Sequence, residues 1–153
     1  MFTDIVSSTQ IAVKRGDRDW SDLREAHNSL IRRELAAFGG REINTTGDGF
    51  VVAFDGPARA VHCAEALREA VAEIGIDLHV GIHTGECRLV EGEFSGLALH
   101  IAARIAELAP PREIIVSRTV KDLVAGSGLD FKDFGVHPLR GVPEDWQLYR
   151  VHN

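Results

Sequence analysis

The order of apolar and polar residues predicts a chain that alternates between strands and helices. Residues 2–6 form a short strand-like run, and "SSTQ" at 7–10 has the Ser and Gln spacing of a capping box, which predicts a short helix ending at Gly16. Two longer helices follow, each with apolar residues three or four positions apart. The first carries Leu23, Leu30, Ile31, Leu35 and Phe38 and ends at Gly39-Gly40; the second begins at Pro57, carries Ala60, Ala64, Leu67, Val71 and Ile74, and ends at Gly75.

A β-hairpin is predicted between these two helices, at residues 41–54, "REINTTGDGFVVAF". Asp48 and Gly49 lie between two apolar runs, and both residue types tolerate the positive φ angles that tight hairpin turns need. Asp48 could therefore serve only to make the chain turn. The alternative is that its carboxylate also holds a ligand.

The remaining pattern completes an α+β fold. A strand is expected at 77–85, a glycine-rich loop at 91–96, a helix at 97–108, a strand at 113–117, a short helix at 118–126, and a late pair of strands at 130–136 and 146–151. The core order β-α-β-β-α-β is typical of a ferredoxin-like sandwich, in which helices cover one face of a sheet. We expect a single domain over residues 1–153, with a C-terminal helix and strands appended to the βαββαβ core.

Composition narrows the class of protein. The chain has 17 Lys and Arg against 23 Asp and Glu, a net charge of −6, which argues against a broad nucleic-acid surface. It has no apolar run of the ~18 residues that a membrane span needs, and no signal peptide, so we expect no membrane contact from this segment. Cys63 and Cys87 are too few for a disulfide framework and indicate reduced thiols in a cytoplasmic protein. Because strand-like sequence begins at the second residue, we expect a fragment of a longer protein.

The predicted topology brings two carboxylates together. In a ferredoxin-like sheet the third strand runs antiparallel beside the first, so the end of strand one meets the start of strand three. Asp4 and Asp48 occupy those two places. Paired carboxylates form a hard oxygen site that suits Mg²⁺ or Mn²⁺ together with substrate phosphates. The alternative is an ordinary strand-end aspartate that lies beside a turn aspartate by chance.

The segment after Asp4 predicts a phosphate-binding helix end. "IVSST" at 5–9 leads into a helix N-terminus, where the free N–H groups of Ser8 and Thr9 favour an anion. A divalent-metal site would then adjoin a polyphosphate cradle. The alternative is that Ser7 only caps its helix.

Several of these segments together resemble a known family. "FTDIVSST", "NTTGDGFVVAF", "VGIHTGE", "GLALHIAARI" and "LRGV" have the order and approximate spacing of a class III nucleotidyl cyclase catalytic domain, over Phe2 to about Val151. The chain is most similar to bacterial, especially actinobacterial, adenylate cyclase domains. The resemblance implies conversion of a nucleoside triphosphate to its 3′,5′-cyclic monophosphate and pyrophosphate. It further implies two Mg²⁺ or Mn²⁺ ions per active site, held by Asp4, Asp48 and the backbone carbonyl of Ile5.

The resemblance also assigns roles to cations and to one histidine. Arg104 matches the family's transition-state arginine, and Arg140 matches a basic residue that reaches the triphosphate. Four residues before Arg104 the family usually has an asparagine that orients the ribose, whereas this chain has His100. Imidazole donates a hydrogen bond but is titratable, which favours a pH-sensitive or slow enzyme. Each residue has an alternative interpretation. Arg104 could be a solvated arginine on a helix, Arg140 a loop cation without a function, and His100 a histidine packed at an interface.

Base recognition is the point at which the chain departs from the family pattern. Adenylate cyclases have a lysine and an aspartate where this chain has Asn44 and Glu93. Glu93 is an acceptor that suits the exocyclic amine of adenine, although Ser95 in the same loop could take its place. Asn44 both donates and accepts, so it could serve either base. We expect ATP as substrate, with imperfect rejection of GTP.

The resemblance implies a head-to-tail homodimer with active sites at the interface. The residues at 44, 93, 100 and 104 would then serve the Asp4 and Asp48 of the neighbouring subunit. The alternative function is a catalytically weak or inactive cyclase-like module that binds nucleotide or a partner and regulates another protein.

Overall fold

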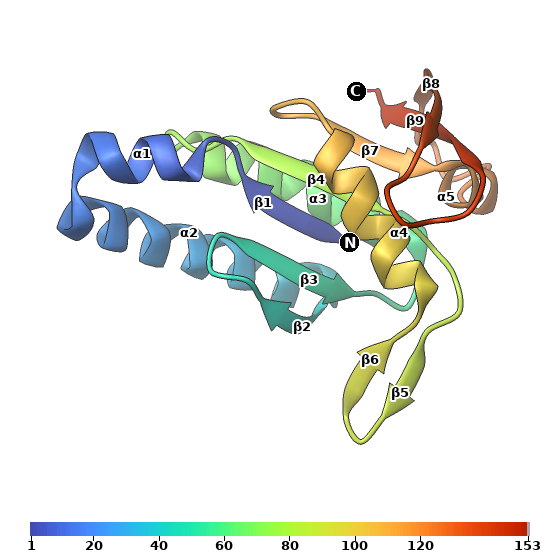
Figure 1. Ribbon diagram of the computed structural model, residues 1–153, viewed down its shortest axis with the longest axis horizontal. Helices are drawn as coiled ribbons and strands as arrows, with labels where there is room; N and C mark the ends of the chain where they lie inside the picture. The colour runs from blue at the N-terminus through green and yellow to red at the C-terminus, as the bar shows by residue number, and fades with distance from the viewer. Residues whose placement is uncertain (153) are drawn as a thin grey trace.

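A seven-stranded β-sheet forms the centre of the structure, a computed structural model that describes residues 1–152 (Figure 1). Its strands follow the order β2-β3-β1-β4-β7-β9-β8. The strands are β1 (Phe2–Ile5), β2 (Arg41–Thr45), β3 (Gly49–Ala53), β4 (Leu78–Ile82), β7 (Ile114–Ser117), β8 (Phe131–Pro138) and β9 (Asp145–Val151), with β5 (Arg88–Val90) and β6 (Glu93–Ser95) in a separate hairpin. The helices are α1 (Ser8–Arg15), α2 (Asp17–Phe38), α3 (Pro57–Ala72), α4 (Leu97–Leu108) and α5 (Arg118–Leu123).

The predicted ferredoxin-like core is confirmed. In the order β2-β3-β1-β4, each strand runs antiparallel to its neighbour. Helix α2 leads into β2 in the first half of the βαββαβ pattern, and α3 links β3 to β4 in the second half. The C-terminal extension also agrees with the sequence pattern. Helix α4 leads to β7, which pairs parallel to β4. After α5, the strands β8 and β9 complete that side of the sheet, with β9 paired to both β7 and β8. No helix in the described part of the chain is both long and apolar enough to cross a membrane.

The helices cover both faces of the sheet, so the expectation of helices on one face is wrong for α4. In Figure 1, α2 and α3 lie behind the sheet, whereas α4 crosses in front of β1 and β4. Gly81 of β4 makes this second layer possible: a Cβ there would lie 2.3 Å from the backbone nitrogen of Ala106 and 2.6 Å from the carbonyl oxygen of Ala102. The alternation along β4 turns Leu78 and Val80 toward the core under α2 and α3.

The glycine-rich segment before α4 is a hairpin and not the loop that the sequence predicted. Val90 pairs with Glu93, and the two residues between them, Glu91 and Gly92, have φ angles of 52° and 82°. Two consecutive positive φ angles produce the tight turn whose twist matches paired strands. The hairpin was missed because Leu89 and Val90 are adjacent apolar residues, so the sequence does not alternate between apolar and polar positions. Both side chains are exposed in the structure. It projects away from the main sheet (Figure 1).

Candidate active site

Asp4 and Asp48 are brought together by the pairing of β1 with β3. Asp4 lies directly opposite Gly49 in the antiparallel register, and Asp48 immediately precedes Gly49. On its other side Asp4 lies opposite His79 of β4. Residues directly opposite one another in a sheet have their side chains on the same face. The His79 side chain lies on the face that α4 covers, because its Nδ1 donates a hydrogen bond of 2.6 Å to the carbonyl of Ala109 at the end of α4. The Asp4 carboxylate is therefore on the α4 face of the sheet.

The turn that presents Asp48 differs in detail from the expected one. The positive φ, 81°, belongs to Gly47, and the Asp48-Gly49 pair does not use the left-handed region. The N–H of Thr46 donates to the carbonyl of Gly49 at 2.9 Å, and the N–H of Asp48 donates to that of Thr46 at 3.1 Å. Gly49 is needed for a different reason, since a Cβ there would lie 2.3 Å from the carbonyl oxygen of Thr3. The glycine thus permits the close approach of β3 to β1 beside the two carboxylates.

The electrostatics of the Asp4 carboxyl show that the two acidic groups interact. Partial burial raises the pKa of Asp4 above its ordinary value, and the charge of Asp48 raises it further. The nearby His79 and a hydrogen bond from the Ile5 N–H act in the opposite direction but do not cancel the rise. Two like charges held this close favour either a proton or a cation between them. The pair therefore has the electrostatic character of a cation site.

The donor set around this pair fits a hard divalent cation. The side chain of Ile5 is buried in the core, so only its backbone carbonyl could contribute a ligand. Within residues 1–152 there is no group of three or more His, Cys, Asp or Glu side chains that could hold a metal. Two carboxylates and a carbonyl oxygen suit Mg²⁺ or Mn²⁺, which complete their shell with water and substrate phosphates.

Helix α1 begins beside these carboxylates, but not with the predicted capping box. Ser7 occupies the N-cap position with a φ of 55°, in the left-handed region, and its side chain makes no capping hydrogen bond. A non-glycine residue in this conformation carries backbone strain, which is concentrated at functional sites. Ser8 and Thr9 are the first two helical residues, and N–H groups in a first turn have no intrahelical acceptor. These groups are available to an anion next to the Asp4–Asp48 pair.

The two expected base-reading residues line one pocket. This pocket, of about 320 Å³, is formed by residues of β2 and of the β5–β6 hairpin: Ile43, Asn44, Gly92, Glu93 and Phe94. A bulge between Glu42 and Asn44 interrupts the pairing of β2 with β3. The structure therefore brings Asn44 and Glu93 together, although they are far apart in sequence, with apolar side chains beside them.

The two expected phosphate-binding arginines also meet, through a residue that the sequence analysis did not select. Arg104 of α4 donates from Nε to the backbone carbonyl of Arg140 at 3.0 Å and from Nη1 to Glu107 Oε1 at 2.5 Å. Arg140 donates from Nη2 to the same Glu107 oxygen at 3.1 Å. His100 is exposed on α4, one turn before Arg104. The spacing of Arg104 and Glu107, three positions apart on a helix, is the sequence signal that could have identified Glu107.

The two groups of residues are not connected within the chain. Among the described residues, no hydrogen bond or ion pair links Arg104 or Arg140 to Asp4 or Asp48.

His79 was also missed by the sequence analysis, because its position opposite Asp4 depends on the strand register.

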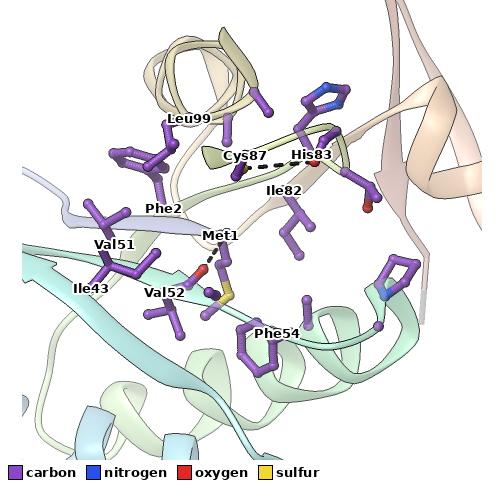
Figure 2. A pocket seen from close by; sticks show the side chains of 18 of the residues that line it. Met1, Phe2, Ile43, Val51, Val52, Phe54, Ile82, His83, Cys87 and Leu99 are labelled. Atoms are coloured by element: carbon purple, nitrogen blue, oxygen red, sulfur yellow. Dashed lines mark hydrogen bonds between the residues drawn. The ribbon is translucent and has the colours of Figure 1, made fainter. Parts of the chain in front are cut away.

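A separate pocket of about 160 Å³ contains none of the expected site residues (Figure 2). It lies near the start of β1, the strand end opposite to Asp4, and Figure 2 shows Phe2, Val51, Ile82 and Leu99 around it. Burial lowers the pKa of His83 in its wall to about 4, and His83 Nδ1 lies 2.7 Å from Ser117 Oγ. A neutral, hydrogen-bonded imidazole among apolar side chains is a structural feature, so we assign the pocket no chemistry.

Comparison with known proteins identifies the family. A profile described as the adenylate and guanylate cyclase catalytic domain matches residues 1–153, so the chain belongs to this family. The putative adenylate cyclase 3 of Rhizobium meliloti (strain 1021) is 33% identical over 112 residues, which are 67% of this chain and 19% of that protein. The adenylate cyclase of Streptomyces coelicolor (strain A3(2)) is 30% identical over 117 residues, 75% of this chain and 31% of that protein. The chain thus spans well under half the length of these relatives.

Solved structures confirm the class III cyclase fold. A structure of adenylate cyclases from Trypanosoma brucei in their monomeric state superposes with a TM-score of 0.86 at 26% identity, covering 98% of this chain and 87% of that one. The adenylyl cyclase CyaB from P. aeruginosa has the same fold, with a TM-score of 0.87 at 19% identity over 99% of this chain and 91% of that one.

The interaction of the two carboxylates predicts a pH-dependent stability. Because the pKa of Asp4 is raised, the folded state disfavours its ionised form, and the contribution of Asp4 to the free energy of unfolding should fall as pH rises above about 4. The lowered pKa of His83 acts in the opposite direction on the whole protein, so the effect is measured as the difference between the wild type and Asp48→Asn. Asp48→Asn removes one cause of the rise, so this fall should be smaller and the metal-free variant should be the more stable protein at neutral pH. Thermal unfolding across this pH range, in the presence of a chelator, measures both effects.

Addition of Mn²⁺ should reverse this order, so that the wild type becomes more stable than Asp48→Asn. The wild type should gain thermal stability from a cation bound between the carboxylates, and Asp48→Asn should gain much less. Asp122→Asn is the matched control, because Asp122 is an exposed carboxylate of α5 that pairs with Arg118 at 3.4 Å. An equal response of the wild type and Asp48→Asn to Mn²⁺ would contradict the cation site.

Proposed function

We propose that this domain is a metal-dependent nucleotidyl cyclase that converts ATP to 3′,5′-cyclic AMP and pyrophosphate, in a pathway of cyclic-nucleotide signalling. The observation that carries the proposal is the pairing of Asp4 with Gly49, which sets two interacting carboxylates beside the N-terminus of α1. A hard cation site next to an anion site is what a magnesium or manganese triphosphate requires. Family membership supports the same class of reaction.

The residues of the chain divide the work of an in-line displacement. Asp4, Asp48 and the Ile5 carbonyl would hold two divalent ions, and the first-turn N–H groups of Ser8 and Thr9 would receive phosphate oxygens. When bound, such ions lower the pKa of the ribose 3′-hydroxyl and neutralise charge on the phosphates. The 3′-oxygen would then lose its proton to solvent and form a bond to the α-phosphorus as the bond to the pyrophosphate oxygen breaks.

The cations on the α4 side would complete the site. Arg104 would offset the charge that develops at the α-phosphate, and Arg140 would contact the triphosphate. His100, one turn from Arg104, would donate a hydrogen bond to the ribose. Catalysis would then depend on positioning and charge stabilisation, with little covalent work for side chains.

We further propose that the active sites form between two subunits arranged head to tail. Within residues 1–152 no hydrogen bond or ion pair joins Arg104 or Arg140 to Asp4 or Asp48, which supports this arrangement because these arginines are not tied to the carboxylates of their own chain. Leu89 and Val90 of the projecting hairpin are 62% and 56% exposed, and Leu97 at the start of α4 is 52% exposed. Apolar side chains gathered at one protruding feature favour burial against a partner.

The pocket that contains Asn44 and Glu93 supports adenine as the preferred base. The Glu93 carboxylate accepts hydrogen bonds and would pair with the exocyclic amine of adenine, whereas guanine has a carbonyl oxygen at that position. Asn44 Oδ1 accepts a hydrogen bond from the Thr45 N–H at 2.8 Å, which leaves the amide NH2 group to donate to adenine. Rotation of the amide would break this bond but would let Asn44 accept from guanine, so Asn44 would not exclude guanine. We therefore propose ATP as the main substrate and GTP as a slower one.

The direct test is to incubate the purified protein with Mn²⁺ and either ATP or GTP and to measure the cyclic product. We expect cyclic AMP to form faster than cyclic GMP, and Asp48→Ala to abolish both activities. Asp122→Ala, which removes an exposed carboxylate on α5, should leave the rate unchanged. Product that survives in Asp48→Ala would refute the metal role, and faster turnover of GTP would refute the assignment of the base. If no condition yields product, the protein is better described as a nucleotide-binding module.

Asn44→Lys tests base reading more narrowly. A lysine ammonium only donates, so it should favour the adenine N1 acceptor and disfavour the guanine N1–H donor. We expect the ratio of kcat/KM for ATP to that for GTP to rise about tenfold, equivalent to ~1.4 kcal/mol. Asn44→Ala is the matched control, since it removes the amide without adding a donor. An unchanged ratio in Asn44→Lys would show that the pocket between β2 and the hairpin does not read the base.

A further inference from the structure

Glu107 holds both candidate phosphate-binding arginines at once. One oxygen of its carboxylate, Oε1, accepts a hydrogen bond from Arg104 Nη1 at 2.5 Å and another from Arg140 Nη2 at 3.1 Å. The side chains of Arg104, Glu107 and Arg140 are 27%, 49% and 75% exposed. The contact also ties α4 to the loop between β8 and β9, which are far apart in sequence.

The three charges depend on one another. Two guanidinium groups that converge on a single oxygen atom repel each other, and the carboxylate between them offsets that repulsion. Arg104 has a second, uncharged anchor, because its Nε donates to the backbone carbonyl of Arg140 at 3.0 Å. Loss of the carboxylate charge would therefore leave Arg104 near its present place while freeing the charged ends of both arginines. A phosphate group could then take the position that the carboxylate oxygen occupies.

We propose that Glu107 is an internal counter-anion, which holds Arg104 and Arg140 in the nucleotide-free protein and gives way to phosphate oxygens when substrate binds. This inference rests on the proposed function, because it assumes that the two arginines meet a polyphosphate. Glu107 is a positioning residue in this account and need not touch the substrate. It keeps the arginines together and also competes with the ligand for them.

If Glu107 and a polyphosphate compete for Arg104 and Arg140, neutralising Glu107 should raise the affinity of the protein for the polyphosphate. Glu107→Gln keeps the size of the side chain and an acceptor oxygen but removes the charge. Because partly exposed ion pairs are modest in strength, we expect inorganic tripolyphosphate to bind about fivefold more tightly to this variant than to the wild type. Glu107→Asp retains the charge and should bind tripolyphosphate as the wild type does.

The matched control is Glu69→Gln. Glu69 on α3 also lies between two arginines, 3.0 Å from Arg68 Nε and 3.9 Å from Arg112 Nη2, and it is 65% exposed. Its neutralisation changes the net charge of the protein by the same amount without affecting the arginines on α4. Glu69→Gln should therefore leave the affinity for tripolyphosphate unchanged.

Isothermal titration of the full chain with tripolyphosphate, at low ionic strength and with a chelator, tests the proposal without requiring turnover. Tighter binding in Glu107→Gln alone, lost again when Arg104→Gln is added, is the expected result. Equal or weaker binding in Glu107→Gln, no detectable binding, or an equal gain in Glu69→Gln would overturn the proposal. A protein that shows the gain but makes no cyclic nucleotide would refute the proposed function and not the counter-anion. A cyclase without the gain would refute only the counter-anion.

Discussion

The antiparallel register of β1 and β3 is the constraint on which the site depends. It sets Asp4 opposite Gly49, so that Asp48, the last residue of the turn between β2 and β3, brings its charge next to that of Asp4. A side chain at position 49 would collide with the carbonyl of Thr3, and the strands could not then approach as closely. The same strand, β1, leads into the strained N-cap at Ser7, so one short segment would position both the proposed cation site and the proposed anion site.

Unbalanced charge is common to the two halves of the proposed active site. At the end of β1, two carboxylates repel each other and the pKa of one is raised. On α4 and the β8–β9 loop, two guanidinium groups converge and are held together by Glu107. A metal nucleoside triphosphate carries cations for the first cluster and anions for the second. The free energy of binding would thus include relief of repulsion in both places, and would be realised fully only when both clusters face the same substrate.

The sequence predicted the topology because apolar spacing and glycine or proline boundaries agreed at almost every element, from the α2 end at Gly39 to the α3 start at Pro57. It also predicted the meeting of Asp4 and Asp48, since that follows from strand order alone. It did not predict the β5–β6 hairpin, whose exposed Leu89 and Val90 give no alternating signal, nor the placement of α4, which depends on a close contact at Gly81. His79 was missed because its role arises from a cross-strand contact that periodicity does not encode. Helical spacing indicates the contact of Glu107 with Arg104, but not its contact with Arg140, which depends on the tertiary structure.

The central claim is that each active site combines the aspartates of one subunit with the arginines of another. The most direct measurement mixes two variants, Asp48→Ala and Arg104→Ala, each expected to be inactive alone. If the subunits assemble head to tail and exchange at random, half of the dimers contain both variants, and one of the two sites in each of these is intact. We therefore expect the mixture to recover about a quarter of the wild-type rate of cyclic AMP formation. A mixture as inactive as its separate components, although the subunits exchange, would contradict a site shared between two chains.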